Sequence, residues 1–223
     1  MIKENVMQRF LSAFLALLLS TTAHAQLAGP GGPASPPVVG NSTVWYTAIP
    51  AGGTVAAGAA QTQNTMSCLP TWVPFAEHWD RVNTNISGAG SSNLQFAIYA
   101  GGLDAAKGRI QPQGTALASS GDNVDTGTGV VTWTISPAVA VGPGVVFICQ
   151  NFNDSTVILN AVGGSGVSNL IGSLNAGFGL VNPIKGLTFA GTYGTWPNLT
   201  GATMAETGTL VIPIMGYRVS TVP

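Results

Sequence analysis

The sequence predicts an all-β protein, an antiparallel β-sandwich or jelly roll preceded by an N-terminal signal-like apolar segment. Three observations favour this class. About nine short segments show the apolar runs or alternation that strands require. Gly, Pro and Asn turns separate these segments, and no segment shows a convincing 3.6-residue period. Many short strands joined by such turns are typical of sandwiches and jelly rolls.

The N-terminal 25 residues have the pattern of a secretory signal peptide. Lys3 and Arg9 precede the apolar residues 10–20, and an Ala-His-Ala cleavage site ends at Ala25. The apolar stretch is too short to span a bilayer. A buried N-terminal helix or an arm embedded in a virion is the alternative interpretation. No later run approaches the length of a transmembrane helix, so we expect no membrane span after cleavage.

The rest of the chain divides into an arm and one domain. Residues 26–42 are rich in Pro and Gly and predict a linker or arm, and residues 43–223 predict the β-sandwich domain. A first strand is expected at residues 43–49. Residues 50–65 are predicted to be a loop of small residues.

The next segments predict strands from their alternation. Residues 67–87 contain two strand-like pieces, and in the second piece alternation places Asp80 and Val82 on one face and Trp79 and Arg81 on the other. Residues 93–100 form the next strand. Its inward side chains are expected to be those of Leu94, Phe96 and Ile98. Residues 101–120 are predicted to be a long loop containing at most a short strand at 115–118.

The best-defined segment is residues 141–152, VGPGVVFICQNF. A Gly-Pro-Gly turn precedes a run that is apolar on both faces, which predicts a strand buried at the centre of a sheet. Before it, residues 130–135 place Val131, Trp133 and Ile135 on an inward face. After it, strands are expected in three segments, and a Gly- and Asn-rich span of loops at residues 163–183 follows the first of them. They are residues 156–162, 187–190 and 208–215, with Pro213 restricting the last to an edge or a bulge.

Composition excludes several classes of function. Charged residues make up 7% of the chain and the formal net charge is −1. Removing the signal-like segment leaves five Lys and Arg against seven Asp and Glu. Near-half apolar content argues against disorder, and the missing basic patch argues against a nucleic-acid partner.

Two cysteines, Cys68 and Cys149, would remain after cleavage. In an exported protein a single pair favours a disulfide. Two buried thiols that never meet are the alternative, because spacing alone does not show that the two Cα atoms come close.

The sequence offers no catalytic constellation, so we predict no enzyme, no cofactor and no metal. The mature chain has one histidine, His78, and no G-x-S-x-G elbow. Glycoside hydrolysis would require carboxylates to converge in one cleft, and alternation places Glu77 and Asp80 on opposite faces. Asp122 and Asp125 could contribute oxygen ligands to Ca²⁺, but Asp is also a common turn residue.

Five tryptophans are the remaining candidates for ligand binding, because indole faces stack on sugars and peptides. Trp133 is expected in the core. Trp79 and Trp196 are the better candidates for exposure and are our weak candidates for ligand binding. Packing in the core or between subunits is the alternative for both residues.

Three segments together resemble a domain of tailed-phage virion proteins, found in tail fibres, tail spikes and baseplate-associated parts. They are WDRVNTNISGAGSSNLQFAIYA, TALASSGDNVDTGTGVVTWTI and VGPGVVFICQNF, within a span, residues 79–152, that is about a third of the chain. The resemblance implies a β-sandwich used as a structural or receptor-binding module, commonly as a trimer. It implies no catalytic residue.

The function expected from these observations is that of a non-enzymatic phage tail or appendage protein that helps to recognise the host surface. A secreted bacterial adhesin or carbohydrate-binding module is the alternative. Expected partners are further copies of the chain, as a homo-oligomer, and other virion proteins or cell-surface glycan. The expected location is the virion or the extracellular space. Residues 101–113 and 163–183 are the loops predicted to form a variable binding surface.

Overall fold

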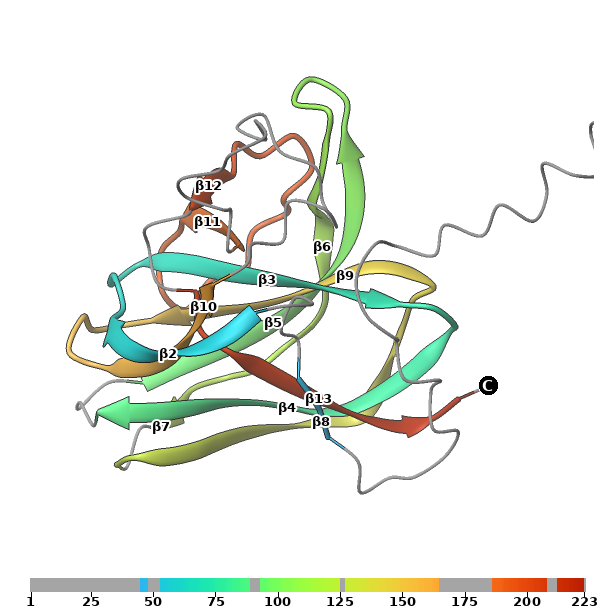
Figure 1. Cartoon of the computed structure of the whole chain (residues 1–223). Coiled ribbons are helices and arrows are strands. Elements are labelled where there is room, and N and C mark those ends of the chain that lie inside the picture. The colour runs from blue at the N-terminus through green and yellow to red at the C-terminus, as the bar shows by residue number, and fades with distance from the viewer. Residues whose placement is uncertain are drawn as a thin grey trace, which may run out of the picture. The chain divides into compact units, whose positions relative to one another are not determined.

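The computed structural model describes residues 45–47, 53–88, 93–124, 127–164, 186–207 and 212–222. All of them belong to the compact unit formed by residues 31–223. The described residues form thirteen strands and no helix, arranged as two antiparallel sheets, so the predicted all-β sandwich is confirmed (Figure 1). The predicted signal peptide and arm lie outside the described residues.

The first sheet, sheet A, is built around one long strand, β4. Its strands are β1 (Trp45–Thr47), β2 (Gly53–Ala60), β4 (Glu77–Gly88), β8 (Gly129–Val141), β10 (Ile158–Gly164) and β13 (Met215–Thr221). Strands β13 and β10 pair with successive parts of β4, and β8 also pairs with β4. Strand β1 extends the sheet beyond β13, and β2 extends it beyond β10.

The second sheet, sheet B, has the predicted apolar strand at its centre. Its strands are β3 (Thr65–Val73), β5 (Asn93–Asp104), β6 (Arg109–Ser119), β7 (Asn123–Val124), β9 (Gly144–Phe152), β11 (Gly186–Ala190) and β12 (Ala205–Thr207). Strand β9 pairs with β3 on one side and with β5 on the other, and all its residues after Gly144 are buried. The prediction of a central strand here is therefore confirmed.

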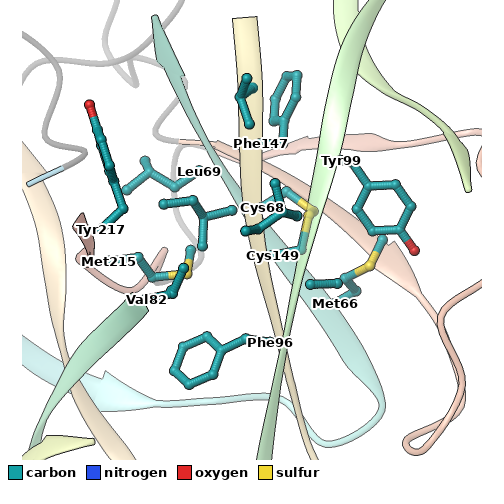
Figure 2. Close-up of a cluster of buried hydrophobic side chains, with 14 of the residues drawn as sticks. Met66, Cys68, Leu69, Val82, Phe96, Tyr99, Phe147, Cys149, Met215 and Tyr217 are labelled. Carbon is teal, nitrogen blue, oxygen red and sulfur yellow. A yellow bond between two sulfur atoms is a disulfide. The ribbon is translucent and has the colours of Figure 1, made fainter. Parts of the chain in front are cut away.

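The main core lies between the two sheets. In Figure 2, Val82, Met215 and Tyr217 of sheet A lie on the same side of sheet B as Leu69 and Phe96. The inward face predicted for Trp133 is also confirmed, because its ring stacks on that of Phe96 with centroids 6.4 Å apart.

A second apolar layer covers the opposite face of sheet B. The segment after β11 crosses this face from β9 to β6, and hydrogen bonds to sheet B hold its backbone along the way. In chain order, Gly191 O accepts from Asn151, Gly194 N donates to Gln95 and Pro197 O accepts from Tyr99. Further on, Leu199 N donates to Gly114 O, and Ala202 O accepts from Gln111. We call residues 191–204 the strap. The side chains of Leu199 and Met204, which belong to the strap, are buried. This second apolar layer explains why both faces of β9 and β5 are apolar.

The predicted disulfide is present. Cys68 of β3 and Cys149 of β9 are directly opposite in the ladder, with Cα atoms 4.1 Å apart and a bond between their sulfur atoms. Both side chains are fully buried. Figure 2 shows the bond on the same side of sheet B as Met66 and Tyr99. This is the side covered by the strap, because Tyr99 donates a hydrogen bond to Pro197 O. The disulfide therefore joins two neighbouring strands of one sheet and does not bridge the two sheets.

Two predicted loops are wrong, and one predicted strand is only partly described. The loop of small residues at 50–65 contains β2, which is set by its long-range pairing with β10. The long loop at 101–120 is instead a hairpin of β5 and β6, and its buried Arg109 and Gln111 contact residues 202–206. Of the last predicted strand, at residues 208–215, residues 208–211 lie outside the described residues. Pro213 makes only an isolated bridge to Ala161, and the described strand β13 begins at Met215. The predicted loop at 163–183 lies almost entirely outside the described residues.

Candidate functional site

The two tryptophans predicted to bind a ligand, Trp79 and Trp196, are buried to different extents. The expectation that Trp79 is exposed is wrong, because its side chain is fully buried and stacks on Tyr217 with ring centroids 4.0 Å apart. Trp196 lies in the strap, partly buried, and its ring is tilted against that of Tyr99. Trp79 therefore offers no face to a ligand, and Trp196 serves mainly to pack the strap.

Trp79 was misplaced because β4 contains a bulge. The pairing of β4 shifts register between Trp79 and Arg81 against both β13 and β8. One extra residue reverses the faces of a strand, so Trp79 and Val82 both point to the core. Asp80 and Arg81 are consequently both directed to the outer face of sheet A, where Arg81 lies opposite Arg218 and Thr134.

A buried carboxyl group lies behind this bulge. Glu77 is 5% exposed, and its Oε2 accepts a hydrogen bond of 2.9 Å from Nε1 of Trp79. Burial raises the pKa of Glu77 above its ordinary value of 4.5, and the bond from Trp79 lowers it by a smaller amount. The indole, the carboxylate and the ring of Tyr217 form one packed unit, which explains the position of Glu77 without a catalytic role.

We expect a Glu77→Gln variant to lose part of the pH dependence of stability. Above pH 4.5 the native state retains the Glu77 proton more tightly than the unfolded state, so stability falls as the pH rises towards the native pKa. Glutamine removes this titration and still offers an amide oxygen to Trp79. Urea unfolding from pH 4.5 to 8 should give a flatter profile for the variant. Parallel profiles for the two proteins would contradict this assignment.

The other predicted acidic candidates do not converge with Glu77. Asp80 forms an ion pair with Arg218 on the outer face of sheet A, so it lies on the opposite face from Glu77, as predicted. Asp122 lies at the far end of sheet B, where its Oδ1 accepts from Gln95 and Tyr193. Asp125 lies outside the described residues. Within the part of the chain that the structure describes, no group of three or more His, Cys, Asp or Glu could hold a metal.

The outer face of sheet A instead carries a row of four side chains on adjacent strands. Strand pairing aligns Trp45 with Arg218, Arg218 with Arg81, and Arg81 with Thr134. We call these four residues the arginine row. Neighbouring strands lie about 4.8 Å apart, so Trp45 and Arg81 are separated by roughly 10 Å. Trp45 is 38% exposed and Thr134 is also exposed.

A second row of polar residues runs beside the first. Pairing aligns Thr47, Gly216, Asn83 and Thr132 across the same four strands, and we call these residues the amide row. A Cβ at Gly216 would lie 2.5 Å from Oδ1 of Asn83, so glycine is what lets the Asn83 side chain lie across β13. The arginine and amide rows together form what we call the outer-face site.

The charges of the outer-face site are unevenly satisfied. Asp80 accepts hydrogen bonds from Nε and Nη2 of Arg218, and these bonds raise the pKa of Arg218. In contrast, Nε of Arg81 is buried and has no hydrogen-bond partner among the described residues. Arg81 and Arg218 are directly opposite each other, and like charges in that position are destabilising. The site thus has one cation, Arg81, without a carboxylate partner among the described residues.

Comparisons of the chain with family models, curated proteins and solved structures found no match. They leave the resemblance to phage virion domains as a prediction. Among the described residues there is also no helix that is long and apolar enough to cross a membrane.

A second group of exposed aromatic residues lies at one end of the sandwich. Trp72 and Phe75 are each 55% exposed, and the neighbouring Pro74 is exposed as well. The β8–β9 turn lies beside them, because a Cβ at Gly142 would be 2.9 Å from the carbonyl oxygen of Phe75. We call Trp72, Pro74 and Phe75 the apolar end.

Sequence reasoning missed the residues of both surfaces. Trp45 and Trp72 carry no signal beyond belonging to the five tryptophans, and Arg218 lies after the last predicted strand, at residues 208–215. One signal was available. In a chain this poor in charge, an arginine within a strand segment, as in WDRV and GYRV, has to find either a partner or solvent.

Proposed function

We propose that the protein is a non-enzymatic recognition module that binds a glycan on a cell surface through the outer-face site. The observation that carries the proposal is the arginine row, which places an exposed indole beside cations and hydroxyl groups on a rigid sheet. Indole faces stack on sugar rings, while guanidinium, amide and hydroxyl groups supply hydrogen bonds. Sites built on strands hold such groups more firmly than loops do.

Replacement of Trp45 by alanine tests this proposal. We expect the wild-type protein to bind members of an oligosaccharide array and the Trp45→Ala variant to lose at least about tenfold in affinity, since a stacked aromatic contributes beyond its buried area. Trp72→Ala is the matched control, because it removes an exposed indole elsewhere and should leave binding unchanged. Binding that survives in the first variant and fails in the second would move the site to the apolar end.

The biological setting that we propose for this module is a phage tail or surface appendage. The resemblance of residues 79–152 supports this setting, and so does the apolar end, because an exposed patch of this kind suits contact between subunits. A secreted adhesin or carbohydrate-binding module is the second candidate. The disulfide favours it, since disulfides persist in oxidising compartments. Either setting is consistent with a virion or extracellular location.

Sedimentation velocity separates these settings. In the virion setting we expect an oligomer held partly through the apolar end, and a Trp72→Ser/Phe75→Ser variant should sediment as a monomer. Serine at these exposed positions leaves the core untouched, so far-UV circular dichroism should not change. A wild-type protein that is monomeric at high micromolar concentration would instead support the secreted module.

A further inference from the structure

We infer that the outer-face site takes a sugar carrying a carboxylate, such as a sialic or uronic acid, with Arg81 holding the carboxylate. The inference rests on the proposed function and names its ligand class. It begins from Arg81, which lies directly opposite Arg218 and, unlike Arg218, has no carboxylate partner among the described residues. An anion between Arg81 and Arg218 would offset the repulsion of their positive charges.

The charge of the outer-face site fits a monoanion. Arg81 and Arg218 carry two positive charges and Asp80 carries one negative charge, which leaves one positive charge to be neutralised. A phosphate monoester carries about −1.5 to −2 at neutral pH and would overcompensate that charge. A carboxylate carries one charge, and its two oxygens match the planar guanidinium fork.

The surroundings of Arg81 fit a sugar rather than a bare carboxylate. Trp45 lies about two strand spacings away, roughly 10 Å, which leaves room for a ring against the indole and a carboxylate over Arg81. Arg218 lies between Trp45 and Arg81, and its hydrogen bond to Asp80 on the outer face of sheet A holds it in place. Thr134 lies on the other side of Arg81, and the adjoining amide row contains Asn83 and Thr132. Their hydroxyl and amide groups can form hydrogen bonds with sugar hydroxyls.

The test is isothermal titration calorimetry with matched pairs of oligosaccharides. The probes are 3′-sialyllactose against lactose and a hyaluronan tetrasaccharide against a chitin tetrasaccharide, with a sulfated disaccharide as a further arm. We expect an acidic member to bind and its neutral counterpart to bind at least about tenfold more weakly, because hydrogen bonds to charged groups are the stronger ones.

The decisive variant is Arg81→Gln, with Lys107→Gln as the control for loss of one positive charge at the distant β5–β6 turn. Arg81→Gln should fold well, because it removes a like-charge pair, and its melting temperature verifies this. We expect it to lose at least about tenfold in affinity for the acidic sugar, while Lys107→Gln binds as the wild type does.

Each other outcome overturns a distinct part of the account. Equal binding of acidic and neutral sugars, unchanged in Arg81→Gln, would overturn the carboxylate assignment and leave the glycan-binding proposal standing. Selective binding of the sulfated disaccharide would replace the carboxylate by a sulfate ester. If no oligosaccharide of the array or the panel bound, the proposed function and this inference would both fall.

Discussion

Removal of the Cys68–Cys149 disulfide is expected to lower the free energy of unfolding by about 4 kcal/mol. The bond closes a loop of 81 residues, and constraint of the unfolded chain by a loop of that length is worth on the order of 4 kcal/mol in the chain-entropy model. The two cysteines are already neighbours in the β3–β9 ladder, so the reduced protein keeps its strand pairing. The effect should therefore appear as lower stability of the same fold.

Urea unfolding of a Cys68→Ala/Cys149→Ala variant measures this effect. Wild-type protein unfolded and refolded in excess reductant is the control, because it lacks the bond but keeps both sulfur atoms in the core. A larger loss in the double alanine variant than in the reduced wild type reports the buried volume of the two side chains. A loss below about 1 kcal/mol in both would contradict a stabilising role for the bond.

Removal of Arg109 is expected to have an effect of similar size. Its guanidinium and the carboxylate of Glu206 are 2% and 8% exposed, with Nη1 and Oε1 2.8 Å apart. Nη2 also donates to the carbonyl of Met204 at 2.5 Å. An Arg109→Met variant leaves a buried carboxylate and a strap carbonyl without this partner. Loss of one member of a buried ion pair costs about 3–5 kcal/mol.

The double variant Arg109→Met/Glu206→Leu distinguishes the pair from the packing around it. We expect it to recover most of the stability lost in Arg109→Met, because replacing both charges by apolar groups is often nearly neutral. Urea unfolding of the single and double variants gives the comparison. If the double variant were as unstable as the single one, the charges themselves would not be responsible.

The parts of the fold that sequence predicted are those set by local pattern. The run from Val145 to Cys149 is apolar on both faces, which identified a central strand. Trp133 was assigned to the core because it alternates with Val131 and Ile135. The disulfide remained one of two alternatives, because pairing of Cys68 with Cys149 depends on the β3–β9 register, which no local pattern records.

The parts that sequence failed to predict depend on distant contacts. The residues of strand β6 show the pattern of a loop, because Arg109 and Gln111 become core residues only when the strap supplies their carbonyl partners. The faces of β4 were reversed at Trp79 by a bulge that alternation does not reveal. The outer-face site could not be foreseen for the same reason, because Trp45, Arg218 and Arg81 meet only through pairing of three strands far apart in the chain.

Hydroxyl-radical footprinting with mass spectrometry tests most directly whether the outer-face site is the binding surface. The labelling is compared with and without saturating 3′-sialyllactose or hyaluronan tetrasaccharide. We expect bound sugar to reduce oxidation of Trp45 several-fold and to leave Trp72 and Phe75 labelled as in the free protein. Protection of Trp72 and Phe75 with Trp45 unchanged would contradict binding at the outer-face site and place recognition at the apolar end.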